Sequence, residues 1–398
     1  MKILLVHSYY QQSGGEEVVL QQEQKYLEQT EEVQVLTFSN NPGIKGAIKF
    51  FLSIWNVFAA ARLKRTIREF QPDVIHVHNW HFGIGPIVIR VARKRKIPVV
   101  LTMHNYRLIC PSAILLSKGK VFMDSMYARF PWKAVWQRAY RNSMTQTFWL
   151  AFIIWFHKKI GTWRMVDKYI VLAEFEKKLF VSATIGIPPE KIEVKPNFAN
   201  RPVVKEGKKG NHFLFIGRLS REKGIHVLLD AFKGTDYELH IGGKGPLTSL
   251  VEQTCKEHKN IKYLGYLDKM GVQQAMYDCT ALVFPSIWYE GLPMTLIEAF
   301  ALGKAIIATK MGVMEIVIQH RYNGLQFEPN DPAALREQLA YWQSLSSDEK
   351  ETYRRNVLTV YTSHYTPEQA MGQLMNLYRT LSSNNKRDRM QLPRLQAV

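Results

Sequence analysis

Two carboxylates in the second half of the chain have the spacing best suited to chemistry. Glu290 and Glu298 stand eight positions apart in PSIWYEGLPMTLIEAFALG, residues 285–303. Residues 281–285 before them are an apolar run rich in strand-forming side chains, and the residues from Pro293 onward have the pattern of an amphipathic helix. The sequence therefore predicts strand, loop and helix, with Glu290 on the loop and Glu298 on the helix.

The predicted helix starts at Pro293, because proline fits the first helical turn, where its missing N–H is not needed. Free N–H groups and a partial positive charge at such a helix start can bind a phosphate. The two carboxylates can accept hydrogen bonds from hydroxyl groups. Phosphate-binding amides beside two hydroxyl acceptors suit a sugar nucleotide.

This stretch resembles the signature of the retaining glycosyltransferases of family four, which have the GT-B fold of two Rossmann-like domains. The matching residues are Pro285, Ser286, Glu290, Gly291, Pro293, Glu298, Ala299, Ala301 and Gly303. One extra residue separates Ser286 from Glu290 relative to the family pattern. The resemblance implies that Glu290 holds hydroxyls of the donor sugar and Glu298 those of the ribose. It also implies that Ser286, Gly291 and Leu292 form part of the donor-binding loop.

A basic motif, GRLSREKG at 217–224, directly follows the apolar run HFLFI. Arginine supplies a planar fork of donors and lysine a mobile charge, a combination that binds diphosphate. Taken alone, the motif is more typical of a basic surface loop. It resembles the family's G-R-x-x-x-x-K-G element, which implies that Arg218 and Lys223 bind the phosphates and neutralise the departing nucleotide.

Glycines that follow other predicted strands would let a ligand approach the backbone closely. Ser13, Gly14 and Gly15 come after the first strand, where a simple tight turn is the alternative. No G-x-G-x-x-G is present there, so the dinucleotide fingerprint is absent. By the resemblance, Gly14 and Gly15 face the donor phosphates, and Gly243 lies near the wall that binds the base.

His104, at the end of the fourth predicted strand, resembles the family's histidine that lies over the donor sugar. Asn105 stands where the family usually has aspartate. Three more histidines, His76, His78 and His81, raise a metal interpretation. No acidic residue shares a ligand-like spacing with them, so we expect no metal site, and the resemblance implies no cofactor.

Apolar runs alternating with helical segments predict two doubly wound α/β domains with parallel sheets. We expect a first Rossmann-like domain at 1–198, facing acceptor and membrane, with a long irregular segment between its fourth and fifth strands. A linker at 199–210 and a nucleotide-sugar-binding Rossmann-like domain at 211–365 follow. By the GT-B resemblance the domains face a cleft, a helix at 366–383 crosses back to the first domain, and 384–398 is a basic tail.

Composition limits the class of protein. The chain has 398 residues, 46% of them hydrophobic, and a formal net charge of +19. Its three cysteines are far apart and odd in number, which favours reduced thiols in the cytoplasm. The apolar start, MKILLVH, is too brief for a signal-peptide core, and no run approaches the ~18–20 apolar residues that span a bilayer.

The positive charge is concentrated between Val74 and Val166, where fifteen Lys or Arg stand against one acid, Asp124. Within it, residues 129–164 combine basic side chains with Phe148–Phe156, a nine-residue apolar run with two tryptophans. This composition is typical of a segment that lies in a membrane interface. A core helix with a solvated basic face is the alternative. Nucleic acid is not expected as a partner, because no recognition motif accompanies the charge.

The resemblance implies a retaining, metal-independent glycosyltransferase, and the basic aromatic segment predicts that it is peripheral on the inner face of the cell membrane. By the resemblance, it moves a sugar from UDP or GDP to a glycan or lipid-linked oligosaccharide acceptor, polyprenyl-linked, in bacterial surface polysaccharide synthesis. Its catalytic residues would be His104, Glu290, Arg218 and Lys223. The alternatives are a GT-B sugar-nucleotide epimerase, which would convert the donor without an acceptor, and a non-catalytic membrane-surface adaptor.

Overall fold

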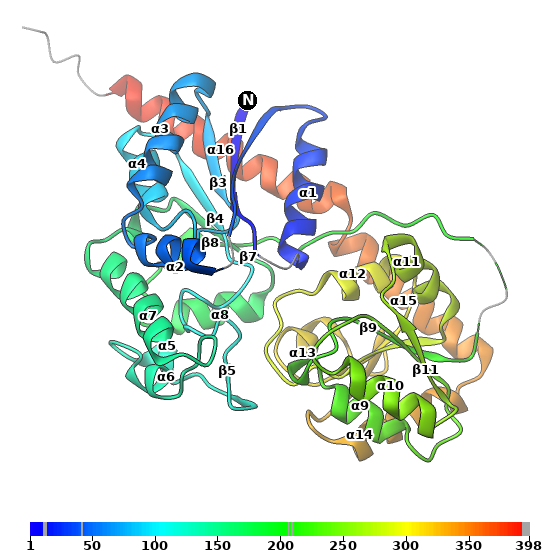
Figure 1. Cartoon of the computed structure of the whole chain (residues 1–398). Helices are drawn as coiled ribbons and strands as arrows, with labels where there is room; N and C mark the ends of the chain where they lie inside the picture. The colour runs from blue at the N-terminus through cyan, green and yellow to red at the C-terminus, as the bar shows by residue number, and fades with distance from the viewer. Residues whose placement is uncertain (11–13, 41–42, 206, 208–209, 392–398) are drawn as a thin grey trace, which may run out of the picture. The chain divides into compact units, whose positions relative to one another are not determined.

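The computed structural model describes residues 1–10, 14–40, 43–205, 207 and 210–391. The chain forms two compact units, each built around a six-stranded sheet (Figure 1). Unit 1 comprises Met1–Ala113, Phe122–Pro196 and Ala370–Val398, and unit 2 comprises Ile114–Val121 and Asn197–Gln369. Two parallel α/β units are what the alternating pattern of the sequence predicts.

The sheet of unit 1 is entirely parallel, in the order β2-β1-β3-β4-β7-β8. Its strands are β1 (Lys2–Ser8), β2 (Glu32–Phe38), β3 (Val74–Val77), β4 (Val99–Thr102), β7 (Lys168–Val171) and β8 (Ile192–Val194). Every residue of β3 and β4 is buried, since helices cover both faces of a doubly wound sheet. Ile3 of β1 pairs with Val33 on one side and Val74 on the other.

Helices surround this sheet. They are α1 (Gly15–Leu27), α2 (Gly43–Leu52), α3 (Val57–Phe70), α4 (Ile87–Lys94), α5 (Asp124–Tyr127), α6 (Trp132–Trp136), α7 (Met144–Lys159), α8 (Glu174–Ser182) and most of α16 (Pro367–Gln391), with 3₁₀ turns η1 (Trp163–Met165) and η2 (Pro189–Lys191). The segment expected to be irregular therefore contains helices. In α7 the cap Ser143 accepts a hydrogen bond from the amide of Gln146, and Leu150 and Ile153 are buried.

The sheet of unit 2 is also parallel, in the order β11-β10-β9-β12-β13-β14. Its strands are β9 (Phe213–Ile216), β10 (Leu239–Gly242), β11 (Ile261–Gly265), β12 (Ala281–Phe284), β13 (Ile306–Thr309) and β14 (Gly324–Phe327). Its helices are η3 (Arg221–Lys223), α9 (Ile225–Phe232), α10 (Thr248–Glu257), α11 (Lys269–Asp278), α12 (Met294–Ala301), α13 (Val313–Val317), α14 (Pro332–Ser344) and α15 (Ser347–His364). A short hairpin, β5 (Leu116–Ser117) and β6 (Lys120–Val121), also belongs to this unit.

The residues of the predicted linker that the structure describes carry no helix or strand, and they belong to unit 2. Ala199, at the start of this segment, accepts a hydrogen bond from the Tyr361 hydroxyl of α15, 2.7 Å away. Residues 206 and 208–209 lie outside the described part.

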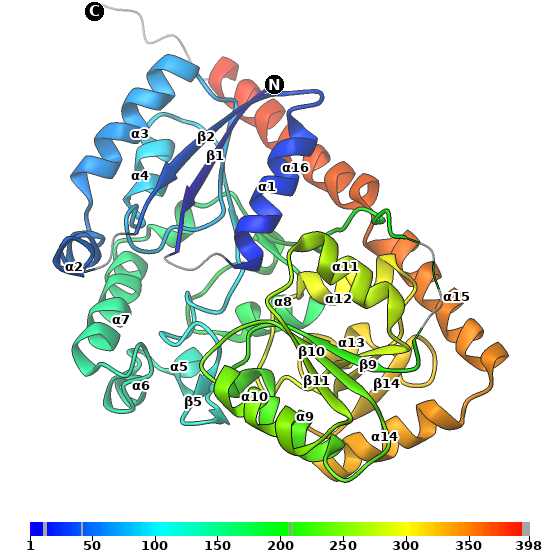
Figure 2. The same ribbon diagram turned by 45° about the vertical axis from the view of Figure 1, so that its right-hand side comes forward.

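The last helix is longer than expected. It continues through the first part of the predicted tail to Gln391, and residues 392–398 lie outside the described chain. From Ala370 onward the chain belongs to unit 1. There α16 runs alongside α1 (Figures 1 and 2), with Tyr378 fully buried.

Candidate functional site

The strand order of unit 2 reverses between β9 and β12, and the loops that leave these two strands carry the predicted motifs. Strands β9, β10 and β11 extend to one side, and β12, β13 and β14 to the other. In open parallel sheets ligands bind at such a reversal, outside the carboxyl ends of the strands. Residues 217–224 follow β9 and residues 285–293 follow β12, so the fold brings the two motifs to one place.

Glu290 is the centre of this place. Its carboxylate is buried, and Oε1 accepts hydrogen bonds from Lys223 Nζ at 2.6 Å, Ser286 Oγ at 2.6 Å and Trp288 Nε1 at 2.8 Å. The ammonium of Lys223 also lies 5.6 Å from the ring centre of Phe284 and 5.4 Å from that of Trp288. Charge-assisted bonds of this length hold the carboxylate in one orientation. The structure therefore unites three predicted residues and adds Trp288.

Close backbone contact joins the two loops. Gly224 has φ +73°, and a Cβ there would lie 1.8 Å from the carbonyl oxygen of Pro285. The amide of Ile287 donates to the carbonyl of Glu222, 3.0 Å away. Only glycine fits a left-handed position with no room for a side chain, so Gly224 sets the spacing between the lysine loop and the glutamate loop.

A third loop, after β10, packs against the first. Gly243 has φ +135°, and a Cβ there would lie 1.9 Å from the carbonyl oxygen of Gly217. The amide of Leu219 donates to the carbonyl of Lys244, 3.1 Å away. Gly243 is thus required by protein packing as well as matching the family position, and it brings the β10 loop to the same sheet edge.

Arg218 is more than half exposed and forms an ion pair with Glu222. Ser220 also donates to Oε1 of Glu222, at 2.7 Å. Burial acts to raise the pKa of Glu222, but hydrogen bonds from Ser220 and Arg218 outweigh it and lower that pKa. Because the guanidinium is accessible, it can turn toward an incoming phosphate.

Glu298 lies on α12 and is partly exposed. Burial raises the pKa of its carboxyl, and Lys269 opposes that shift. The helix begins one residue later than expected: Pro293 is the extended cap, with ψ 134°, and Met294 is the first helical residue. Leu292 is buried, and its carbonyl accepts a hydrogen bond from Asn197 at 2.9 Å.

Unit 1 has its own strand-order reversal, between β1 and β3. His104, after β4, is partly exposed, and its Nε2 lies 3.1 Å from Nδ1 of His78, a residue that follows β3. Nε2 of His78 in turn lies 3.4 Å from Oε2 of Glu23 on α1. Glu23 is fully buried and forms an ion pair with Lys195. His104 thus ends a buried chain of polar side chains.

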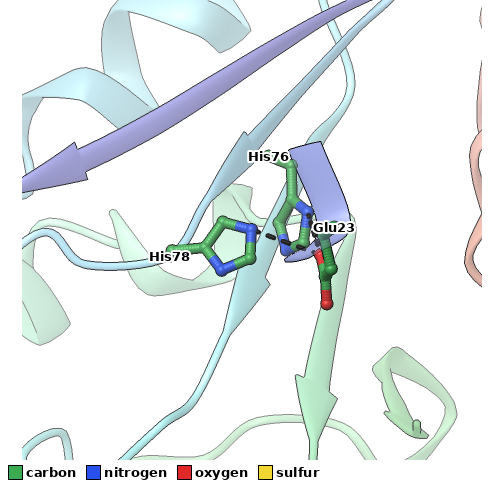
Figure 3. A group of neighbouring side chains, drawn as sticks. All are labelled: Glu23, His76 and His78. Carbon is green, nitrogen blue, oxygen red and sulfur yellow. Dashed lines mark ion pairs between the residues drawn. The ribbon is translucent and has the colours of Figure 1, made fainter. Parts of the chain in front are cut away.

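Figure 3 shows Glu23 with His76 and His78. No acidic residue shares a ligand-like spacing with these histidines in the sequence, but α1 brings Glu23 beside them from a distant part of the chain. Both ring nitrogens of His76 are already used, by the Tyr378 hydroxyl at 2.5 Å and the Thr102 hydroxyl at 2.6 Å. The positive charge of Lys195 further opposes a cation at this position, so we interpret the cluster as a structural network.

The glycine turn after β1 is accompanied by a charged cluster that the sequence analysis missed. Gly14 caps α1, Gly15 begins it, and a Cβ on either would meet no described atom within 4 Å; Ser13 lies outside the described residues. Burial raises the pKa of Glu16 to about 8, against the opposing charge of Arg107. In the sequence, the feature that could have pointed to Arg107 is its position three residues after His104.

Arg107 itself is buried. Its Nη2 lies 3.3 Å from the Tyr10 hydroxyl, and its Nη1 has no hydrogen-bond partner among the described residues. A small cavity of about 20 Å³ is lined by Arg107, His104 and Asn105, among others. A buried guanidinium with an unused donor beside His104 suits a negatively charged or hydroxyl-bearing group.

Both halves of the chain match families of known proteins. Residues 12–201 match the family described as Glycosyltransferase Family 4, and residues 197–358 match Glycosyl transferases group 1. An uncharacterized glycosyltransferase of Methanocaldococcus jannaschii is 26% identical over 351 residues, which are 85% of this chain and 87% of the relative.

Two further relatives align over shorter stretches. The D-rhamnosyltransferase WbpZ of Pseudomonas aeruginosa is 34% identical over 161 residues, 39% of this chain and 41% of the relative. The O-antigen chain mannosyltransferase C of Escherichia coli is 28% identical over 176 residues, 43% of this chain and 47% of the relative. The chain thus spans less than half of each of these two relatives.

Solved structures share the whole architecture. HepE of Anabaena in complex with UDP superposes with a TM-score of 0.67 at 17% identity, covering 96% of this chain and 100% of that chain. Sucrose-phosphate synthase of Thermosynechococcus elongatus gives a TM-score of 0.70 at 15% identity, covering 96% and 99%. These likenesses show the fold, and the two family matches together run from residue 12 to residue 358. The chain is accordingly a glycosyltransferase of the GT-B fold that resembles family four.

Proposed function

We propose that this glycosyltransferase retains the anomeric configuration and takes its sugar from a UDP or GDP donor. Its acceptor would be a polyprenyl-linked glycan in bacterial surface polysaccharide synthesis. One relative is named for mannosyl transfer to the O-antigen chain and another for D-rhamnosyl transfer. A structural relative was solved with UDP. These names support a nucleotide-sugar donor and a role in polysaccharide synthesis.

The observation that carries the proposal is the buried Glu290 carboxylate, held by Lys223, Ser286 and Trp288 where the strand order of unit 2 reverses. A carboxylate with three fixed donors on one oxygen is suited to hold sugar hydroxyls in one position. Such positioning converts binding energy into rate, because the reacting atoms are already aligned. Glu298 on α12 would hold the ribose hydroxyls.

In the proposed reaction the bond between the anomeric carbon and the diphosphate breaks, and the acceptor hydroxyl bonds to that carbon on the same face. The departing phosphate oxygen takes the acceptor proton. Arg218 and Lys223 neutralise the charge that develops on the diphosphate, so the proposed reaction needs no metal. His104 would lie against the sugar ring, and Gly14 and Gly15 would leave room for the donor phosphates.

The proposed location is the inner face of the cytoplasmic membrane. Residues 129–164 contain α6 and α7, and their apolar side chains are unevenly buried: Trp132 and Trp136 of α6 are exposed, whereas Leu150 and Ile153 of α7 lie in the core. Within α7, Met144 and Phe148 are exposed opposite this core side, which supports the proposal that the segment lies in the membrane interface. Attachment of the exposed side of residues 129–164 to anionic lipid would bring a lipid-linked acceptor to the enzyme.

A thermal-shift panel of nucleoside diphosphates and their sugars tests the proposal. A ligand that binds the folded form alone raises the melting temperature, and we expect UDP or GDP to do so. Arg218→Ala should reduce that shift by weakening diphosphate binding. The anomeric configuration of the transferred sugar is then read by NMR. An inverted product would refute retention, an epimerised donor would favour an epimerase, and no shift with any nucleotide would favour an adaptor.

A further inference from the structure

The bend between α2 and α3 exposes apolar side chains that the sequence analysis did not single out. The exposed side chains, here called the elbow, are Ile48, Phe51, Leu52, Trp55, Val57 and Phe58. Phe58 is 75% exposed and Val57 57%. So many neighbouring apolar side chains in water are unusual for a soluble surface and indicate a binding face.

The elbow is continuous with α7. The ring centre of Phe51 lies 5.4 Å from that of Trp149, and the ring of Trp55 stacks on His157 at 5.9 Å. Trp149 Nε1 donates to the carbonyl of Phe50 at 3.2 Å, which fixes one helix against the other. The elbow thus extends the aromatic face of α7 instead of forming a separate patch.

The two helices that flank the elbow lie at a sharp bend. Among the described residues no single helix is long and apolar enough to cross a bilayer, although Gly46–Leu52 with Val57–Phe70 is sufficient in length and composition if taken as one bent pair. That pair bends by 77°. In α3, Ala59, Leu63 and Ile67 are buried in unit 1, so the helix lies on the protein, and its exposed large apolar side chains, Val57 and Phe58, are in its first turn.

A basic groove opens beside the elbow. It has a volume of about 640 Å³ and is lined by Trp55 and Val57 from the elbow together with apolar side chains of α3 and α4. Its cations are Lys64, Arg90, Arg93, Lys94 and Arg95, and none of the described residues that line it is acidic.

Two of these cations have local tasks. Arg93 pairs with Asp167 at 2.8 Å, and Arg90 donates to the carbonyl of Ile160 at 3.0 Å. The basic last turn of α4 also complements the negative end of that helix. These local contacts do not explain Lys64 on α3. They also do not explain why the exposed side chains of Trp55 and Val57 line the groove. Cations beside apolar side chains match a phosphate that carries hydrocarbon.

We propose that this groove binds the phosphate headgroup of an anionic phospholipid while the elbow enters the membrane interface. The proposal deepens the membrane part of the proposed function and rests on it. Lys64 and Lys94 would meet the phosphate, and Val57 and Phe58 would lie at the boundary of headgroups and acyl chains. The elbow and groove form an anchoring site outside residues 129–164.

Flotation of the full chain with vesicles tests this proposal without any transfer reaction. The vesicles are pure phosphatidylcholine or its mixture with phosphatidylglycerol, at low salt. Wild type should bind the anionic vesicles. Lys64→Glu with Lys94→Glu should weaken that binding by at least about 30-fold, because each cation near an anionic surface contributes roughly a factor of five. Val57→Ser with Phe58→Ser should weaken binding to the same vesicles without changing net charge.

The charge-matched control is Lys256→Glu with Lys259→Glu, both exposed residues of unit 2, and it should bind like wild type. Circular dichroism and nucleotide-induced thermal shifts should be the same for all variants, which separates this proposal from the proposed activity. Undiminished vesicle binding by the Lys64 and Lys94 variant would overturn the proposal. The proposal would also fail if Lys158→Glu with Lys159→Glu on α7 abolished binding while the elbow and groove variants bound like wild type. Release by inorganic phosphate, beyond chloride of equal ionic strength, would assign the groove to free phosphate instead.

Discussion

At Glu290, three hydrogen-bond donors of different chemistry converge on one carboxylate oxygen. Lys223 supplies charge, Ser286 a hydroxyl, and Trp288 a rigid N–H. A buried carboxylate needs such partners, because burying an unpaired charge is strongly unfavourable. The same bonds fix the orientation that hydroxyl binding requires.

Glu290→Gln should lower kcat/KM for glycosyl transfer by roughly ten- to 150-fold. The side chain keeps its shape but loses the charge, and hydrogen bonds to charged groups are worth about 1.5–3 kcal/mol. Steady-state kinetics measure the loss. Glu252→Gln, an exposed acid on α10 of the same unit, is the control and should behave as wild type. Equal rates in both variants would remove Glu290 from the reaction.

Among the elements, loop-to-loop contact through glycine holds the site together. Gly224 and Gly234 have nearly the same left-handed φ, +73° and +70°. A Cβ at Gly234 would meet nothing within 4 Å, whereas one at Gly224 would collide with Pro285. Alanine at Gly234 therefore introduces backbone strain alone, whereas alanine at Gly224 introduces the same strain together with a steric collision.

Gly234→Ala should destabilise the chain by about 1–2 kcal/mol, the strain of a left-handed residue with a side chain. Gly224→Ala should be clearly worse, since the loops after β9 and β12 must also move apart, and it should weaken nucleotide binding. Chemical denaturation and calorimetric binding give the two quantities. Similar losses at both sites would show that the loop contact at Gly224 is dispensable.

For the whole molecule, ionisable groups buried in unit 1 set the pH range of stability. Burial lowers the pKa of His7 and His157 to about 4 and shifts the pKa of four further histidines well below the usual range: His76, His78, His81 and His104. Burial raises the pKa of Glu16 and Glu176 to about 8. The two kinds of group act in opposite directions.

Stability should be greatest near pH 6.5 and fall on both sides. Below the unfolded histidine pKa of about 6.5, the unfolded chain binds protons that the folded chain does not, so each histidine lowers stability by up to about 1.4 kcal/mol per pH unit. Glu16 and Glu176 act against this loss of stability, but the histidines with lowered pKa are more numerous. Above pH 6.5 the two glutamates lower stability, since their protonated folded forms are lost as pH rises through about 8. Scanning calorimetry across this range measures the curve.

Glu176→Gln, which cannot ionise, should flatten the alkaline side of that curve and make the acid side steeper, because Glu176 no longer opposes the histidines between about pH 4.5 and 6.5. Glu176 accepts a hydrogen bond from the amide of Leu172 at 2.6 Å, which glutamine can also accept. A curve that still falls as steeply above pH 6.5 in this variant would contradict the assignment of that limb to buried carboxyls.

Local sequence determined the parallel strands and the motif residues of unit 2. Each apolar run is directly followed by its functional loop, so strand and loop can be recognised together within a few residues. Lys223, Ser286 and Glu290 could be named for this reason, and sheet topology then brought their loops together at the strand-order reversal.

Tertiary structure alone decided which distant groups meet. Glu23 reaches His78, and Tyr378 of the last helix reaches His76. The helices in the segment expected to be irregular, and the exposed side of the α2–α3 bend, were likewise invisible to residue spacing. Periodicity reports which face of an element is apolar. It does not report what covers that face, because this depends on strand order and on helices that arrive from remote parts of the chain.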